Sequence, residues 1–591
     1  MSLKKYKISI KEIIKIIELN YNIKGSVEKL DGEIDFNYKI QSSNANNYLL
    51  KISRPNFDKD YIDYQIKLLD HLNTDCKIEL AFNISTVDNK KFCVFKDSFG
   101  NDRCVRLISW IDGRLWSSVN PIEESLRRQL GVKSAILSNS LNNFNHSFSK
   151  RKIDWDISNC LWVEEHIEKF DINKREIVLN IIKSFKNNLP IYKKLKKSII
   201  HNDINDNNII VSNDLLKPTI NSIIDFGDSV FSQTINDLAI TCSYGIMNVN
   251  DPLAACCEII NGNNSISIIS DEELKLLYNL IAVRLVISVT KSLINKIEEP
   301  ENEYLLISEK PAWNLLKKWS KINSEYAYYS FRKACNLDAH QNKSKFTKWT
   351  KNKKFSITDL FPGINKNKFF KIDLSIGSEW IGGRNEIEDL DVFQFKIECL
   401  QKKNSDKIIA GGYLEPRSIY TSNNYEKIGN YGSESRTVHL GLDFWIPPKT
   451  KVCAMFDGEV LTAVNDKGHK EYGGLIILKH TTEDMEFYTL YGHNTVDSVL
   501  KNKVGSKVKK GDVIAEIANY PENGNWATHL HFQIMLSMLD YETDYPGVCF
   551  YNQIDVWKDL CPDPNLLFKS KELAVNIFES SKELLKYRNN H

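Results

Sequence analysis

The stretch IIHNDINDNNIIV, residues 199–211, contains Asp203 and Asn208 in the pattern H-x-D-x-x-x-x-N. Seventeen residues after Asn208, the stretch SIIDFGD (222–228) adds Asp225. Phosphoryl transfer needs a carboxylate that orients and deprotonates the accepting hydroxyl, and oxygen ligands that hold Mg²⁺ on the nucleotide phosphates. Asp203 fits the first task, and Asn208 and Asp225 fit the second. The two motifs at this separation therefore predict a kinase-like fold.

Residues 1–110 alternate helical and extended patterns, as expected for the small lobe of such a fold. IKEIIKIIELNY (10–21) has the spacing of an amphipathic helix, and FNYKIQSS (36–43) followed by NYLLKIS (47–53) predicts a hairpin of two strands. Lys51 ends the second of these strands, where a lysine can hold the α- and β-phosphates of a nucleotide. A surface lysine is the alternative, and the downstream motifs favour the phosphate role.

The acidic partner of Lys51 is not evident from the sequence. Asp63, in the helical stretch KDYIDYQIKLLDHLN, is a candidate, whereas Gln65 in the same stretch cannot form an ion pair. The loop before the hairpin also lacks the G-x-G-x-x-G pattern of protein kinases.

The rest of the chain divides by its periodicity into four further segments. Residues 111–336 are mainly helical and predict the large lobe. Residues 337–369 are polar and rich in lysine, which favours a solvated linker over a nucleic-acid-binding patch. Residues 370–565 show short apolar runs bounded by Gly, Pro and Asn, which predict an all-β domain, and residues 566–591 predict a terminal amphipathic helix. The expected fold class is a multidomain α+β protein.

Bulk composition excludes several classes of function. The formal net charge of +2 gives no electrostatic reason to expect a nucleic acid or an anionic membrane as partner. The N-terminus lacks the apolar run of a signal peptide, and we expect no segment with the ~20 apolar residues that span a bilayer. None of the 12 cysteines lies in a CxxC pair, so we expect a reduced, cytoplasmic protein.

Histidines gather in the predicted β domain in a pattern that suggests a metal. His529 and His531 alternate along the strand-like stretch THLHFQI and should share one face, while His439 and Asp443 lie four residues apart in RTVHLGLDF. His493 follows in FYTLYGHN. Catalytic zinc takes three His or carboxylate ligands and keeps an open position, so two further histidines remain for acid–base work and transition-state stabilisation. A His pair on a strand can also be structural.

The front half resembles the aminoglycoside phosphotransferase superfamily, through HNDINDNNIIV and IIDFGDSVFSQTINDLAI. Asp228 and the sequence NDLAI are similar to its hydroxylysine-kinase branch, and the similarity spans roughly residues 10–336. This resemblance implies ATP- or GTP-dependent phosphorylation, with Mg²⁺, of a hydroxyl on a small amine or hydroxy-amino acid. Asp228 is then either a receptor for the substrate ammonium or a structural carboxylate. An aminoglycoside-type antibiotic phosphotransferase is a further alternative.

The back half resembles LytM/lysostaphin-type zinc endopeptidases through its H-x-x-x-D, LYGH and HLHF motifs. This resemblance implies that His439, Asp443 and His531 bind Zn²⁺ and that His493 and His529 are catalytic, with a peptide as substrate. Domains of this type also occur as binding modules, so a docking role stays open.

The two halves together resemble the front part of bacterial kinase–peptidase–aminotransferase fusion proteins, through stretches such as AGGYLEPRSIYT and WKDLCPDPNLLF. The third, pyridoxal-phosphate-binding domain of those fusions has no counterpart here. The resemblance therefore suggests a separate pyridoxal-phosphate-dependent phospholyase or aminotransferase as partner.

Overall fold

A computed structural model describes residues 8–575, apart from residues 31, 33, 34, 299–308, 354, 367, 379, 384, 421 and 422. The chain divides into two compact units, Met1–Cys335 and Asn336–His591. The first unit contains both predicted kinase lobes, and the second contains the predicted linker and β domain.

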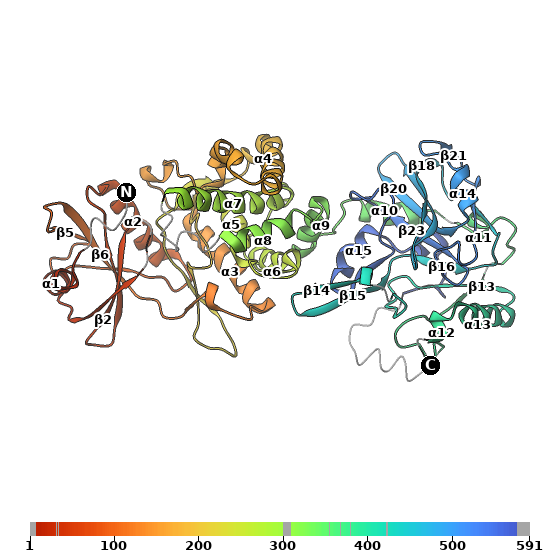
Figure 1. The fold of residues 1–591 in the computed structure, drawn as a ribbon, viewed down its shortest axis with the longest axis horizontal. Helices are drawn as coiled ribbons and strands as arrows, with labels where there is room; N and C mark the ends of the chain where they lie inside the picture. Colours follow the sequence, from red (N-terminus) through yellow and green to blue (C-terminus); the bar gives the residue numbers. More distant parts are fainter. Residues whose placement is uncertain are drawn as a thin grey trace. The chain divides into compact units, whose positions relative to one another are not determined.

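The small lobe of the first unit is an antiparallel sheet with a helix on one face (Figure 1). The helix, α1 (Ile10–Tyr21), begins at a capping box made by Ser9 and Glu12 and buries Ile13 and Ile17 against the sheet. The predicted hairpin is confirmed as β2 and β3. The strands run in the order β1-β2-β3-β6-β4 with β5 on β6: β1 (Gly25–Leu30), β2 (Phe36–Ser42), β3 (Asn47–Ile52), β4 (Asn83–Ile84), β5 (Cys93–Lys96) and β6 (Asp102–Ser109).

The large lobe is mainly helical, as predicted, and its short strands carry the motif loops. The strands pair as β10-β9-β7 and β11-β8: β7 (Arg114–Leu115), β8 (Lys197–Ile200), β9 (Ile209–Val211), β10 (Ile220–Ile223) and β11 (Val230–Gln233). The helices are α2 (Lys59–Asp75, from the small lobe), α3 (Glu124–Leu141), α4 (Ile172–Tyr192), α5 (Ile235–Gly245), α6 (Pro252–Asn264), α7 (Asp271–Glu298), α8 (Glu309–Trp319) and α9 (Ser324–Ala334).

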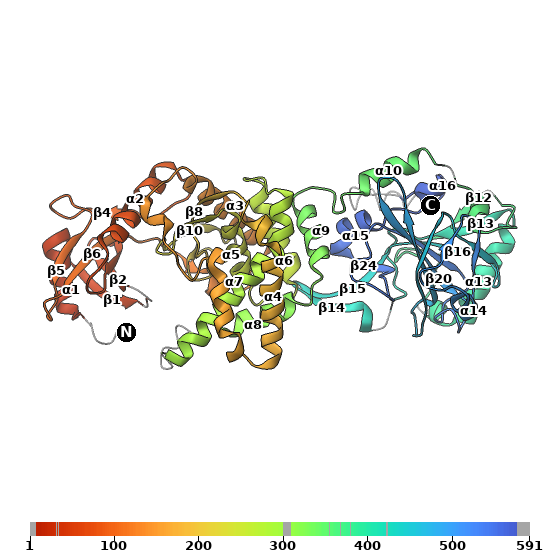
Figure 2. The same ribbon diagram turned by 90° about the horizontal axis from the view of Figure 1, so that it is seen from above.

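Helix α7 runs through the large lobe and touches α4, α5, α8 and α9 (Figure 2). Among the described residues it is the one helix long and apolar enough to span a membrane by length and composition, which the sequence analysis did not expect. However, 78% of its apolar window is buried inside the protein. Neighbouring helices cover nearly all faces of α7, and a helix that is buried on all sides is apolar all round. Its composition is therefore that of a core helix.

The segment predicted to be a solvated linker, residues 337–369, is folded into the second unit. It forms α10 (Lys343–Lys351) and α11 (Ile357–Leu360) and buries six apolar side chains in the core of that unit: Phe346, Phe355, Ile357, Leu360, Phe361 and Phe369. Lys343 also pairs with the buried Asp559 at 2.5 Å. This packing was not predicted because the segment is rich in lysine, and a short helix needs only a few apolar residues to bury one face.

The second unit is built on an eight-stranded sheet in the order β12-β13-β16-β23-β20-β19-β18-β21. These strands are β12 (Lys368–Lys371), β13 (Lys407–Gly411), β16 (Leu442–Trp445), β18 (Gly458–Asp466), β19 (Gly473–Thr481), β20 (Glu486–Asn494), β21 (Lys507–Val508) and β23 (Leu530–Met535). Two smaller sheets comprise β14 (Glu426–Gly429), β15 (Gly432–His439) and β24 (Val548–Phe550), and β17 (Lys451–Cys453) with β22 (Val513–Glu516).

Residues 370–565 were predicted to form an all-β domain. They are rich in strands, but they also contain helices. They include α12 (Asn385–Glu388), α13 (Leu390–Lys403), α14 (Val496–Lys501) and α15 (Ile554–Leu560). Helix α13 buries only Phe393 and Ile397, so its apolar stripe is too narrow to stand out in the sequence. At the C-terminus, α16 (Asn565–Phe568) is short, and most of the predicted terminal helix lies outside the described residues.

Candidate functional sites

The loop after β8 is held by a carboxylate from α5. Asp237 accepts the backbone N–H of His201 at 2.9 Å and that of Asn202 at 2.8 Å, one on each oxygen. The His201 ring donates to the carbonyl of Ile224 through Nε2 and accepts the N–H of Asp203 at Nδ1, so it is neutral. Burial lowers the pKa of His201 to about 4. The loop is therefore fixed from both sides before any ligand binds.

Asp203 is held by three side chains that leave its carboxylate in one orientation. Oδ2 accepts the side-chain amides of Asn205 at 2.9 Å and Asn208 at 2.8 Å, and Oδ1 pairs with Nη2 of Arg284 at 2.9 Å. Burial raises the pKa of Asp203 to about 8, while the guanidinium of Arg284 opposes that rise. The structure thus brings the two predicted residues of this loop, Asp203 and Asn208, into direct contact.

Arg284, which is fully buried on α7, was not predicted as a site residue. Its guanidinium donates to the carbonyl of Trp155 at 2.7 Å and lies 4.8 Å from the Trp155 ring and 5.5 Å from that of Tyr244. A charged residue is almost never fully buried without a partner, so one arginine within the apolar run LYNLIAVRLVISVT was the available signal. Asp237 lies in the stretch NDLAI, and no role was predicted for it from the sequence.

Lys51 on β3 reaches the second motif. Its ammonium lies 3.5 Å from Oδ1 of Asp225, and this charge lowers the pKa of Asp225. Asp225 has φ +62°, a backbone conformation that is uncommon outside glycine and frequent at functional sites. Asp63 is not the partner of Lys51, because it faces the surface and pairs with Lys67 at 2.7 Å and with His146 at 3.1 Å.

Helix α2 is tied to this motif through Gly227 instead of through an ion pair. The carbonyl of Gly227 accepts the hydroxyl of Tyr61 at 3.1 Å and Nη2 of Arg151 at 2.7 Å. Asp228, the next residue, is half-buried, and the positive charges of Arg284, Arg151 and Lys51 act on its carboxylate. Burial and the charge of Asp225 raise the pKa of Asp228.

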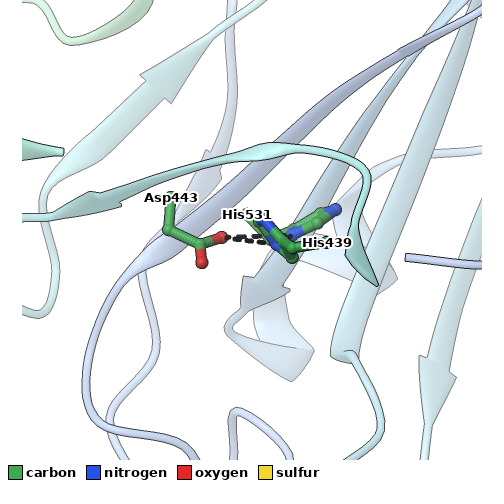
Figure 3. A group of neighbouring side chains, drawn as sticks. All are labelled: His439, Asp443 and His531. Carbon is green, nitrogen blue, oxygen red and sulfur yellow. Dashed lines mark hydrogen bonds and ion pairs between the residues drawn. The ribbon is translucent and has the colours of Figure 1, made fainter. Parts of the chain in front are cut away.

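Five residues of the second unit were predicted to form a zinc site, and three of them lie together as possible metal ligands: His439, Asp443 and His531 (Figure 3). His439 ends β15, whereas Asp443 lies on β16, so the two belong to successive strands and not to one extended segment. His531 on β23 is the direct cross-strand partner of Asp443. Oδ1 of Asp443 lies 3.1 Å from Nδ1 of His531 and 3.3 Å from Nε2 of His439, and these two nitrogens are 2.9 Å apart.

The hydrogen bonds made by Nδ1 of His439 and by Nε2 of His531 decide what this cluster can bind. Nδ1–H of His439 donates to the carbonyl of Gly412 at 3.0 Å, and Nε2–H of His531 donates to Oε1 of Gln533 at 3.0 Å. Each neutral ring therefore turns an unprotonated nitrogen toward the other and toward the Asp443 carboxylate. Lone pairs this close need a cation between them, and a His₂–carboxylate set suits zinc. Burial lowers the pKa of His439 to about 3, which keeps it in the ligand form.

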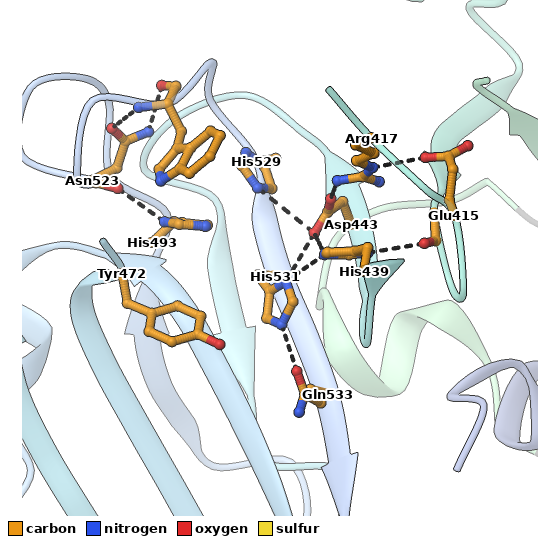
Figure 4. Close-up of polar contacts among 12 residues, drawn as sticks. Glu415, Arg417, His439, Asp443, Tyr472, His493, Asn523, His529, His531 and Gln533 are labelled. Carbon is orange, nitrogen blue, oxygen red and sulfur yellow. Dashed lines mark hydrogen bonds and ion pairs between the residues drawn. The ribbon is translucent and has the colours of Figure 1, made fainter. Parts of the chain in front are cut away.

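His493 and His529 stand beside the cluster (Figure 4). Their ring centroids are 4.4 Å apart, and Nε2 of His529 lies 3.6 Å from Oδ1 of Asp443. Nδ1–H of His493 donates to the carbonyl of Asn523, and Nδ1–H of His529 donates to that of Ala527, so each ring keeps Nε2 as a free base. The backbone of His493 has φ +68°, another left-handed residue at a candidate site.

A cavity of about 370 Å³ opens over these five residues. Its walls are aromatic and charged, and include Tyr420, Tyr425, Arg436, Lys470, Glu471, Tyr472, Trp526 and Asp544. Tyr472 donates its hydroxyl to the carbonyl of Tyr545 at 3.0 Å. A metal held at the cluster would therefore face a cleft lined by aromatic and charged side chains.

Comparisons with known proteins match both parts of the chain to families. Residues 26–255 match the phosphotransferase enzyme family, and residues 437–541 match peptidase family M23. The chain contains a phosphotransferase-family domain followed by a peptidase family M23 domain. Both family resemblances predicted from the sequence are confirmed. The predicted α+β multidomain fold is confirmed as well.

The phosphotransferase domain is similar to three hydroxylysine kinases. That of Bos taurus is 26% identical over 296 residues, which is 47% of this chain and 78% of that protein. That of Xenopus laevis is 27% identical over 236 residues, 38% of this chain and 63% of that protein. That of Danio rerio is 24% identical over 337 residues, 55% of this chain and 95% of that protein.

Among solved structures, a microcompartment-associated aminopropanol kinase is 14% identical with a TM-score of 0.43, and covers 53% of this chain and 98% of its own. An amicoumacin kinase in complex with AMP-PNP is 15% identical with a TM-score of 0.41, and covers 56% of this chain and 97% of its own.

Proposed function

We propose that this protein is a bifunctional enzyme: a kinase of a hydroxyl on a small amine or hydroxy-amino acid, joined to a zinc-dependent peptide or amide hydrolase. The observation that carries the kinase half is the contact of Asp203 with Asn208 and Arg284, which presents one carboxylate in a fixed orientation. The similarity to hydroxylysine kinases supports an acceptor of the hydroxylysine kind. ATP or GTP with Mg²⁺ is the phosphate donor.

Each kinase residue has a task that its position supports. Asp203 orients the acceptor hydroxyl and takes its proton, and its raised pKa makes it a better base than an ordinary carboxylate. Asn208 and Asp225 would supply oxygens to Mg²⁺, which would neutralise charge on the nucleotide phosphates. Lys51, 3.5 Å from Asp225, holds the phosphates beside that metal. Asp228, a half-buried carboxylate, binds the substrate ammonium.

The test is ATP consumption by the purified protein with hydroxylysine, ethanolamine, other amino alcohols and aminoglycosides. Asp203→Asn serves as the blank, because the amide cannot accept the proton. A hit among the hydroxy-amines that vanishes in this variant supports the proposal. A preference for aminoglycosides would instead favour an antibiotic phosphotransferase. Asp228→Asn should raise KM for the amine far more than KM for ATP, since the lost carboxylate acts on the ammonium alone.

For the hydrolase half, the supporting observation is the His439–Asp443–His531 cluster with two free histidine bases beside it. The three residues would hold Zn²⁺, which polarises a scissile carbonyl and acidifies water when bound. Nε2 of His493 and Nε2 of His529 are placed to take up and return the proton of the attacking water. The carbonyls of Asn523 and Ala527 hold both rings with these nitrogens free.

Zinc removal tests this half within the same chain. Stripping with a chelator should abolish cleavage of a peptide library, zinc should restore it, and phosphorylation should stay unchanged because the kinase half uses Mg²⁺. A protein that binds one zinc tightly yet cleaves no peptide or amide would favour the alternative, a zinc-stabilised docking module.

The phosphorylated product suggests a third activity in a separate protein. Phosphate is a far better leaving group than hydroxide, so a pyridoxal-phosphate-dependent phospholyase or aminotransferase is proposed as the partner that consumes it. Adding such an enzyme to the kinase reaction should release inorganic phosphate from the product. No release from the isolated product would count against this partner.

A further inference from the structure

A segment that precedes the family M23 match runs alongside the first histidine of the metal cluster. The match begins at residue 437, whereas the segment spans residues 412–417. Its backbone pairs with the end of β15: Leu414 N–H donates to the carbonyl of His439 at 2.8 Å, and His439 N–H donates to that of Glu415 at 3.1 Å. Arg417 N–H donates to the carbonyl of Thr437 at 2.9 Å. The segment is therefore fixed to the strand that delivers His439.

Arg417 extends from this segment to the carboxylate of the cluster (Figure 4). Its Nη1 lies 2.6 Å from Oδ2 of Asp443, and its Nε lies 2.7 Å from Oε2 of Glu415. The side chains of Arg417 and Asp443 are 3% and 1% exposed, and that of Glu415 is 9% exposed. The other oxygen of Glu415 accepts the N–H of Leu374 at 3.1 Å. Glu415, Arg417 and Asp443 thus form a buried row of alternating charges that ends at the metal cluster.

The two oxygens of Asp443 have separate partners as a result. Oδ1 faces ring nitrogens of His439, His529 and His531, and Oδ2 pairs with the guanidinium of Arg417. A carboxylate held in this way can offer a metal one oxygen without rotating. A free carboxylate can instead bind through both oxygens and take up a second coordination position.

Gly412 makes room for this arrangement. Its carbonyl accepts Nδ1–H of His439, and its φ of +106° is a conformation that favours glycine. A Cβ at this position would lie 1.8 Å from Nη2 of Arg417 and 3.1 Å from Nδ1 of His439. The same glycine therefore orients one ligand of the cluster and leaves space for the arginine that holds another.

We propose that Arg417 is a positioning residue of the zinc site, which restricts Asp443 to binding the metal through Oδ1 and leaves a coordination position open for water. This inference rests on the proposed zinc function. Glu415 makes it possible, because it balances the guanidinium that would otherwise be buried close to a divalent cation. Groups that hold metal ligands from behind typically account for a 10- to 100-fold difference in metal affinity.

The experiment measures zinc affinity of the full chain by competition with a chromophoric chelator. Arg417→Met keeps the length of the side chain and removes its charge, so we expect zinc to bind about 10- to 100-fold more weakly. Arg417→Lys, which keeps the charge but not the fork of donors, should lie in between. Arg436→Met is the matched control: Arg436 lines the same cavity but donates to the carbonyl of Asn424, away from the cluster, so zinc affinity should not change.

Two readouts separate positioning from a general loss of structure. If Arg417 acts through Asp443, the Arg417→Met change should have little further effect on zinc affinity in an Asp443→Asn background. With Co²⁺ in place of zinc, the wild type should show the intense visible absorption of a four-coordinate site, and Arg417→Met the weaker absorption of a higher coordination number. If Arg417→Met fails to fold, the zinc affinity and the Co²⁺ spectrum are measured on Arg417→Lys instead.

The possible failures can be told apart. If the wild type binds no zinc, or binds it equally well after His439→Ala, the proposed zinc function is wrong. If the wild type binds zinc through His439 but Arg417→Met matches it in affinity and Co²⁺ spectrum, only the role of Arg417 is wrong. Equal losses from Arg417→Met in the wild-type and Asp443→Asn backgrounds would also overturn that role.

Discussion

Arg284 on the core helix α7 and Asp203 in the loop after β8 form an ion pair of 2.9 Å, although 81 positions separate them in the chain. Within the large lobe, the guanidinium of Arg284 is enclosed by the rings of Trp155 and Tyr244. The orientation of the proposed base therefore depends on a helix outside the matched family region, residues 26–255.

Replacing Arg284 by methionine should lower kcat of the kinase by about 10²-fold, the scale expected when a reacting group loses its alignment. KM for ATP should change little, because Arg284 does not contact Lys51 or Asp225. Steady-state kinetics on the best acceptor found in the screen measures both constants. Lys296→Met on the same helix is the control, since Lys296 makes only an exposed pair with Glu309.

Replacing Lys51 by methionine should lower kcat/KM for ATP by about 10²- to 10³-fold, the usual cost of removing one preorganised charge from a transition state. Asp225 would lose the charge that keeps it ionised in the absence of metal. Kinetics with ATP as the varied substrate checks this prediction. Asp63→Asn should have no comparable effect, because Asp63 pairs with Lys67 and His146 at the surface. A large loss in Asp63→Asn would revive it as a functional partner of Lys51.

His493→Ala should lose peptide cleavage by about 10²- to 10⁴-fold, the range for removal of a general acid–base group, and should keep its zinc. The ring of His493 is held by Asn523 and lies outside the three-residue donor cluster. Cleavage assays together with zinc content per chain measure the two effects. Zinc loss in this variant would mean that His493 is a ligand and not a catalytic base.

Phe346→Ala should destabilise the second unit by about 3–5 kcal/mol, the cost of removing a large aromatic side chain from a packed core. Phe346 is fully buried and packs edge-on against Phe487 at 5.3 Å between ring centroids. Denaturant unfolding of the full chain measures the change, with Lys345→Ala on the exposed face of α10 as control. If the segment were a solvated linker, both variants would be neutral.

His480 should make the second unit less stable in mild acid. Its ring is buried between Phe456 and Phe487, and burial lowers its pKa to about 4 although the nearby Asp457 opposes this. Below about pH 6.5 the unfolded chain gains a proton on His480 and the folded chain does not. Stability is therefore constant above that pH and falls by about 2 kcal/mol by pH 5.

Denaturant unfolding at pH 7 and pH 5 tests this prediction. His480→Gln should be less stable at pH 7 but should lose less stability on acidification than the wild type. His469→Gln, at an exposed position, should keep the wild-type difference. An unchanged pH difference in His480→Gln would show that other groups cause the acid sensitivity.

The sequence alone determined both family resemblances, because each rests on short motifs such as HNDINDNNIIV and THLHFQI. Asp203 and Asn208 lie five residues apart in one loop, and His529 and His531 lie two residues apart at the start of β23. In such cases local geometry already decides which side chains can meet. The structure brings Asn208 into contact with Asp203, and gathers His439, Asp443 and His531 in one cluster.

Tertiary structure decided which groups hold those residues, since such contacts join segments far apart in the chain. Neither Arg284 behind Asp203, nor Arg417 behind Asp443, nor Asp225 beside Lys51 follows from spacing or periodicity. The burial of residues 337–369 belongs to the same class, because it depends on a sheet that those residues cover. A charge or a polar run is ambiguous in sequence, and only the surrounding fold shows whether it faces water or a buried partner.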